Sequence, residues 1–149
     1  MQIGEICHRD VIRIGKEASV LAAAQAMREH HVGDVIVTEL ASGIEKPIGI
    51  VTDRDIVVEL LAKEIDPNTV TVGDVMSLTV VTAKYDADIF ETLRFMDIKG
   101  VRRLPVLDRN GSLFGILSAD DFLGVLTKEL SFLADLSQRQ IERERTTRA

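Results

Sequence analysis

An internal repeat limits the possible folds of this chain more than any other feature. Residues 3–7 align with residues 72–76 at an offset of 69, and the offset holds as far as Val37 and Val106. A connection three residues longer in the first copy then reduces the offset to 66, at which residues 49–55 align with residues 115–121. One copy alone is marginal in size, so two copies are expected to share a core.

Each copy has the pattern of strand, helix, strand, turn, strand and helix. Short β-branched runs at residues 11–14 and 80–82 predict the first strands. Apolar residues at i, i+4 and i+7, starting at Val20 and at Ile89, predict one helix per copy. Asn110-Gly111 between apolar runs predicts a hairpin. The predicted fold class is therefore α/β, of the α+β type, with two β-α-β-β-α repeats.

The chain is expected to divide into three segments. The first repeat is predicted at 1–66, the second at 67–128 and a C-terminal helical extension at 129–149. Asp66-Pro67-Asn68 supplies the turn residues between the repeats.

Composition excludes several classes of function. The net charge of −6 disfavours nucleic acid as a partner, because an acidic surface repels phosphates. No apolar run approaches the roughly 20 residues of a membrane span, so no membrane partner is expected. Cys7 is the single cysteine, which fits a cytoplasmic location because disulfides belong to oxidising compartments.

The most informative motif is Gly-hydrophobic-hydrophobic-Thr/Ser-x-x-Asp, which occurs in both copies. It begins at Gly49 and again at Gly115. A hydroxyl residue at a strand–helix junction can accept from backbone amides, and free amides there can hold an anion. The aspartate three residues later can accept from ribose hydroxyls. The same pattern also outlines a capping box that needs no ligand, so a ligand site and a helix cap both remain possible.

The duplicated motifs resemble a tandem of CBS domains, known as a Bateman module. The second copy carries them as Gly73-Asp74-Val75-Met76, Arg103-Leu104-Pro105-Val106 and residues 115–121, and the resemblance covers roughly residues 1–128. It implies two copies packed by their sheets around a pseudo-twofold axis. It also implies a non-catalytic regulatory module with two clefts, in which AMP, ADP, ATP or sometimes NAD or S-adenosylmethionine binds.

The resemblance also implies roles for individual residues. Aspartates would hold ribose hydroxyls, hydroxyl residues would contact phosphate or ribose oxygens, and apolar residues would flank adenine. The corresponding residues are Asp55, Asp121, Thr52, Ser118, Ile50, Ile116, Val11 and Val80. The apolar members are equally compatible with an ordinary core.

The two copies differ at one charged position. Arg103 lies where related modules place a basic residue for phosphate, and its counterpart in the first copy is Asp34. A guanidinium can clamp phosphate oxygens, whereas a carboxylate repels them. The cleft containing Ser118, Asp121 and Arg103 is therefore expected to bind phosphate-bearing ligands more tightly, with Arg54 as a partial substitute in the other cleft.

Other chemistry is not predicted. Cys7-His8 and His30-His31 match no structural zinc spacing, so no metal site is expected. No Ser-His-Asp order, P-loop or dinucleotide fingerprint is present, so the sequence indicates no enzyme and no catalytic cofactor.

The C-terminal segment suggests a protein contact. An apolar stripe of Phe122, Leu126, Leu130 and Leu133 continues past the second repeat, and the end beyond Leu136 is polar enough to fray. The stripe favours a homodimer through helical faces that include this segment. Two hypotheses follow: a nucleotide sensor that acts on an unknown effector protein, or a ligand-free dimerisation scaffold whose motifs are only helix caps.

Overall fold

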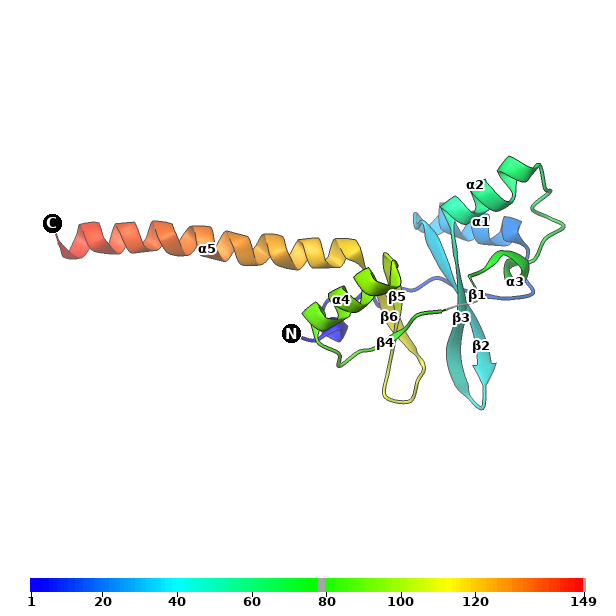
Figure 1. The fold of residues 1–149 in the computed structure, drawn as a ribbon, viewed down its shortest axis with the longest axis horizontal. Helices are drawn as coiled ribbons and strands as arrows, with labels where there is room; N and C mark the ends of the chain where they lie inside the picture. The colour runs from blue at the N-terminus through cyan, green and yellow to red at the C-terminus, as the bar shows by residue number, and fades with distance from the viewer. Residues whose placement is uncertain (78–79, 149) are drawn as a thin grey trace.

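The computed structural model describes residues 1–77 and 80–148 and contains two three-stranded sheets with helices around them (Figure 1). The first half comprises the 3-10 helices Ile3–Glu5 and Leu61–Lys63 with β1 (Arg13–Gly15), α1 (Val20–His30), β2 (Asp34–Ala41), β3 (Ile44–Thr52) and α2 (Asp53–Glu59). The remainder comprises α3 (Val72–Val75), β4 (Ala83–Lys84), α4 (Ile89–Lys99), β5 (Arg103–Leu107), β6 (Leu113–Ser118) and α5 (Ala119–Thr147).

The two sheets have the same topology. In each, a short first strand pairs in parallel with the middle strand, and the middle strand pairs antiparallel with the last. The register shifts at Val37/Thr38 in the first sheet and at Val106/Leu107 in the second, which are equivalent positions of the repeat. The predicted fold class and duplicated architecture are confirmed. The first strands are shorter than expected, and β4 begins after the predicted run 80–82.

The opening segments of the two repeats are exchanged between the packed units. The amide of Gly4 donates to the carbonyl of Tyr85 at 2.8 Å, and Ile3 is buried in the core of the second repeat. Conversely, Val72 is buried in the core of the first repeat, and its amide donates to the carbonyl of Ala18 at 2.7 Å. Each packed unit is therefore completed by a segment that the repeat in the sequence assigns to the other.

A shared core joins the two sheets. Val11, Ile36 and Leu113 are buried together, and Ile50 and Ile116 pack against them from β3 and β6. Because these residues come from both copies, apolar burial holds the sheets face to face across the pseudo-twofold axis. This packing also brings the two strand–helix junctions to the seam between the repeats.

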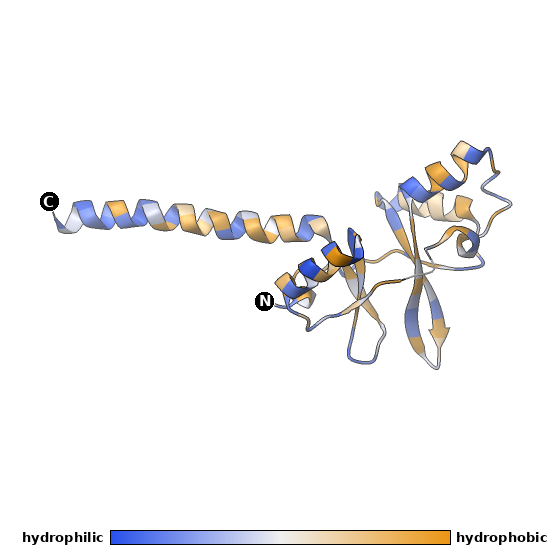
Figure 2. Ribbon diagram, in the orientation of Figure 1, coloured by the Kyte–Doolittle hydropathy of each residue, from blue (hydrophilic) through white to orange (hydrophobic). Residues whose placement is uncertain are grey.

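The last helix extends well beyond the two sheets. At 1.5 Å per residue, its 29 residues span about 43 Å. Beyond its first turns α5 is exposed, and no other described segment lies beside it (Figure 1). Figure 2 shows apolar residues along much of its length and a polar C-terminal end. The helix continues to Thr147, so the fraying expected after Leu136 is wrong.

Candidate ligand-binding clefts

The junction between β3 and α2 is a complete capping box. The amide of Thr52 donates to Asp55 Oδ2 at 2.9 Å, and the amide of Asp55 donates to Thr52 Oγ1 at 3.2 Å. These bonds satisfy two amides that a helix start leaves without partners. Within the described residues, Asp55 Oδ1 accepts no hydrogen bond from the protein. That oxygen can therefore accept from a ligand while the cap stays intact.

The junction between β6 and α5 has a different set of bonds. The amide and the hydroxyl of Ser118 both donate to Asp121 Oδ2, at 2.7 and 2.9 Å. The other oxygen of Asp121, Oδ1, lies 2.8 Å from Nε2 of His8. Both oxygens of Asp121 are therefore engaged within the protein, unlike those of Asp55.

The first cleft, with a volume of about 360 Å³, lies between the two repeats. The β3–α2 junction borders it on one side, and apolar and basic residues up to the first residue of β5 border it on the other. Its lining comprises Ile50, Thr52, Asp55, Ser77, Val80, Val81, Gly100, Val101, Arg102 and Arg103. Apolar walls with a few convergent polar groups are the usual features of a small-molecule site, and the volume falls in the usual range.

The second cleft, of about 320 Å³, is related to the first by the repeat. The β6–α5 junction encloses it together with residues of the first copy. Its lining comprises His8, Asp10, Val11, Ile12, Val32, Gly33, Asp34, Arg103, Ile116, Ser118 and Asp120. Asp121 contacts His8, has a side chain only 9% exposed, and is not among the residues that line the cleft.

Of the residues expected to share one cleft, Ser118 and Arg103 both line the second cleft, whereas Asp121 does not line it. Each cleft combines the strand–helix junction of one copy with the segment before the middle strand of the other. Arg102 and Arg103 therefore lie in the cleft of Thr52 and Asp55, and Arg103 also borders the second cleft. An alignment offset shows which residues are equivalent, but it does not show which of them meet across the pseudo-twofold axis.

An ion pair crosses the axis between the clefts. Arg103 Nε contacts Asp34 Oδ2, and these two residues occupy equivalent positions of the repeat. Burial raises the pKa of the Asp34 carboxyl, while the charge of Arg103 acts in the opposite direction. The carboxylate that was expected only to repel phosphate thus also neutralises part of the arginine charge.

The other predicted site residues are divided among three locations. Ile50, Thr52, Asp55 and Val80 line the first cleft, and Val11, Ile116 and Ser118 line the second. Arg54 is exposed on the first turn of α2 and lines neither of these clefts, so its expected role as a substitute has no geometric support.

The sequence did not predict that His8 and Ser77 line the two clefts. These residues are equivalent at the offset of 69. Each follows an opening segment that packs on the other unit, and each donates its amide to an isoleucine carbonyl of the repeated motif. The distance is 2.9 Å from His8 to Ile116 and 3.1 Å from Ser77 to Ile50. The alignment signalled their equivalence, but only the exchange of segments brings them to the clefts.

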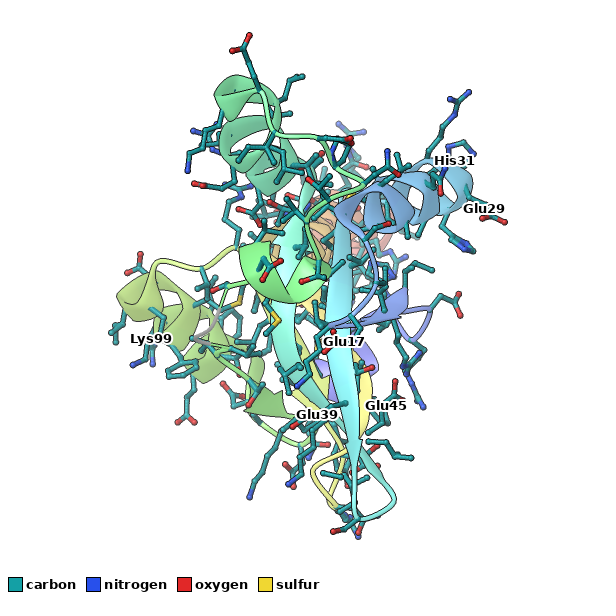
Figure 3. The ribbon with its side chains drawn as sticks, turned by 90° about the vertical axis from the view of Figure 1, so that its right-hand side faces the viewer. Glu17, Glu29, His31, Glu39, Glu45 and Lys99 are labelled. Atoms are coloured by element: carbon teal, nitrogen blue, oxygen red, sulfur yellow. The ribbon has the colours of Figure 1, made fainter. Side chains whose placement is uncertain are left out.

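A metal site would need at least three His, Cys, Asp or Glu side chains close enough to hold one ion. No such group is found among residues 1–77 and 80–148. Glu29 and His31 project outward at the C-terminal end of α1 (Figure 3).

Across the described residues 1–77 and 80–148, no helix combines the length and the apolarity that crossing a membrane requires.

Comparison with known proteins identifies the repeat. The model of the CBS domain family matches residues 3–62 and again residues 72–128. An uncharacterised protein of Methanopyrus kandleri is 37% identical over 125 residues, which are 84% of this chain and 62% of that protein. The chain thus spans less than two thirds of this relative.

Solved structures share the fold. A hexameric CBS-CP12 protein from bloom-forming cyanobacteria is 31% identical, with a TM-score of 0.74 over 83% of this chain and 69% of that chain. Hypoxic Response Protein I, solved with two coordinated zinc ions, is 34% identical with a TM-score of 0.69, over 83% and 97% of the two chains. A CBS domain pair solved with 5′-methylthioadenosine and S-adenosyl-L-methionine is 22% identical, with a TM-score of 0.74 over 87% and 98%.

Proposed function

The chain belongs to the CBS domain family, and on this premise we propose that it is a non-catalytic regulatory module that binds an adenine nucleotide between its two repeats. The observation that carries the proposal is the first cleft, where a strand–helix junction with an available carboxylate oxygen faces two arginines. The repeats at 1–66 and 67–128, the extension at 129–149 and a cytoplasmic location stay part of the proposal.

The first cleft offers a group for each part of a nucleotide. Asp55 Oδ1 would accept from a ribose hydroxyl, and the apolar side chains of Ile50 and Val80 would flank the adenine. Arg102 and Arg103 would hold the phosphate, because guanidinium groups bind phosphate oxygens through paired hydrogen bonds. Thr52 would contact a phosphate or ribose oxygen, since its hydroxyl retains a donor while it caps α2.

The second cleft offers a related but more acidic surface. Ser118, Ile116 and Val11 lie where Thr52, Ile50 and Val80 lie in the first cleft. Asp10, Asp34 and Asp120 replace the arginine-rich border, so phosphate is expected to favour the first cleft. This preference is the opposite of the one expected from the sequence.

Binding would regulate by shifting a conformational equilibrium. A ligand that contacts both repeats can change shape or partner affinity only as far as it prefers one state over another. No residue set with the geometry of a catalytic centre is proposed, and AMP, ADP, ATP, NAD or S-adenosylmethionine would act as a signal and not as a catalytic cofactor. A solved CBS domain pair holds 5′-methylthioadenosine and S-adenosyl-L-methionine, which supports the proposal that this fold can bind adenosine compounds.

Replacing Asp55 with asparagine tests the ribose contact. Asp55→Asn is expected to weaken AMP binding about 10-fold, because a hydrogen bond to a charged acceptor is worth about 1.4 kcal/mol more than one to a neutral acceptor. Asp74→Asn is the matched control, since Asp74 makes the same capping box with Thr71 but borders neither cleft. Isothermal titration calorimetry with AMP measures both. Equal losses in the two variants would contradict the assignment of Asp55 to the ribose.

A second candidate function, dimerisation without a ligand, is favoured by the exposed face of α5. Its exposed apolar side chains are Leu123, Leu126, Leu130, Phe132, Leu133, Leu136 and Ile141. A helix with no neighbour is marginal in water, so a second α5 is the occupant we propose for this face. The helix has four acidic residues and one lysine before residue 136, but three arginines and two glutamates after residue 138, which favours antiparallel pairing of two copies.

A charge placed on this face tests the dimer. Leu130→Asp is expected to raise the dimer dissociation constant by at least about 10-fold, because the interface would bury an unpaired carboxylate. Ser131→Asp adds the same charge one residue away, outside the apolar stripe, and is expected to leave the dimer intact. Sedimentation equilibrium gives both constants. A wild-type chain that stays monomeric at about 100 µM would contradict the pairing, because its dissociation constant would then be too weak for a specific dimer.

A further inference from the structure

His8 covers the aspartate of the second cleft. Its Nε2 lies 2.8 Å from Asp121 Oδ1, and the Asp121 side chain is 9% exposed whereas that of His8 is 70% exposed. Two backbone hydrogen bonds of 2.9 Å between His8 and Ile116 fix the base of the histidine. His8 lines the second cleft and Asp121 does not, so the imidazole occupies the carboxylate oxygen that would otherwise accept from a ribose hydroxyl.

Among the residues that the structure describes, none forms a hydrogen bond or ion pair with Asp55 Oδ1 in the first cleft as His8 does with Asp121 in the second. Ser77 occupies the equivalent position there, with its amide bonded to the Ile50 carbonyl at 3.1 Å. A serine side chain is too short to span the distance that the imidazole of His8 spans. The difference between the two clefts at this position is thus a single pair of side chains, His8 and Ser77.

The charges of the second cleft also select against phosphate. The described residues that line it include three carboxylates, from Asp10, Asp34 and Asp120, and one arginine, Arg103, which already pairs with Asp34. Asp120 Oδ1 also lies 3.9 Å from Arg102 Nη2, but both of these side chains are 80% exposed. A phosphate brought into this cleft would therefore meet more negative than positive charge. The apolar side chains of Val11, Ile12 and Ile116 remain available to a base.

We propose that the second cleft binds a ribonucleoside without a phosphate group, and that His8 is a specificity-determining residue that limits its affinity by holding Asp121. This inference rests on the proposed function, because it assigns the nucleotide itself to the first cleft. The ligand would displace the imidazole from Asp121 Oδ1 and donate a ribose hydroxyl in its place. The chain would then bind a charged nucleotide in the first cleft and an uncharged ribonucleoside in the second.

A reciprocal exchange of the two side chains tests the proposal, with adenosine and AMP as probes. Adenosine is titrated by calorimetry into protein already saturated with AMP, so that the first cleft is filled. His8→Ser is expected to tighten adenosine binding between about 3-fold and 10-fold, because a hydrogen-bonding contact with one exposed partner is worth less than a buried one. Ser77→His is expected to weaken AMP binding by a similar factor.

The outcomes separate this inference from the function on which it rests. Uptake of one adenosine per AMP-saturated chain, with the expected response to His8→Ser, supports it. Binding of two AMP molecules per chain, or no response of adenosine to His8→Ser, overturns it while leaving the first cleft as a nucleotide site. If AMP does not bind at all, the proposed function fails, and adenosine titration of the ligand-free protein still decides whether His8 limits the second cleft.

Discussion

Gly115→Ala is expected to lower the free energy of unfolding by about 3 kcal/mol, because overpacking at a rigid contact is costly. A Cβ at Gly115 would lie 2.6 Å from the carbonyl oxygen of His8 and 3.0 Å from Sγ of Cys7. The nearer atom is a backbone oxygen that accepts from the amide of Ile116 at 2.9 Å, and the amide of His8 donates to the carbonyl of Ile116 at the same distance. The N-terminal segment would therefore have to separate from β6. Thermal unfolding followed by circular dichroism is expected to show a loss of about 10 °C.

Gly124→Ala is the matched control for this substitution. A Cβ at Gly124, within α5, meets no atom within 4 Å. Alanine there is expected to raise the free energy of unfolding by at most about 1 kcal/mol through helix propensity. A stable Gly115→Ala protein, with an unfolding temperature equal to that of Gly124→Ala, would contradict the close packing of the exchanged N-terminal segment.

Arg103→Ala is expected to weaken AMP binding between about 10-fold and 100-fold, because a charge-assisted hydrogen bond contributes about 1.5–3 kcal/mol. Arg103 borders the first cleft and is the less exposed of its two arginines. The affinity for adenosine, which lacks the phosphate, is expected to change by less than about 3-fold, since an uncharged ligand makes no such bond. Calorimetric titration with the two ligands separates loss of the phosphate contact from general damage to the cleft.

Two further variants show whether the effect of Arg103→Ala comes from the phosphate contact, from the loss of a charge in general, or from the ion pair with Asp34. Arg145→Ala removes the same charge from the far end of α5 and is expected to leave AMP binding unchanged. Asp34→Asn removes the carboxylate that pairs with Arg103, so it is expected to strengthen AMP binding by about 2- to 5-fold, the value of one partly exposed ion pair. Weaker AMP binding in Asp34→Asn would mean that the ion pair positions Arg103 and does not compete with phosphate.

The repeat made most of the architecture predictable. Apolar spacing in α1 and α4 and the turn at Asn110-Gly111 are local signals, and the structure has the helices and the hairpin that they predict. The start of β4 was misplaced because residues 80–82 satisfy strand propensity but pair with no strand in the sheet. Strand propensity depends on neighbours that a single sequence does not show.

The composition of the clefts could not be predicted in the same way. Thr52 and Asp55 were found because their motif is local. Their grouping with Arg102 and Arg103 depends on how two units meet around an axis, and it is the reason we propose the opposite order of phosphate affinity. The contact between His8 and Asp121 was missed for a related reason, because only the exchange of the opening segments brings these two residues together.

The C-terminal helix is longer than the polarity of its last residues predicted. Its polar residues after position 136 favoured fraying, yet the helix continues to Thr147. The mixture of arginine and glutamate at 142–145 is compatible with helix, and no glycine or proline follows Gly124. The apolar face before this polar end is the feature that a second copy would explain.

The most direct test of the central claim is the unfolding temperature of the wild-type chain in AMP, ADP, ATP, NAD and S-adenosylmethionine. A ligand at 100 times its dissociation constant adds about 2.7 kcal/mol to stability. For a chain of this length, that predicts a rise of roughly 5 to 10 °C with at least one of these ligands. No rise with any of them at millimolar concentration would contradict nucleotide binding and leave the repeated motifs as helix caps.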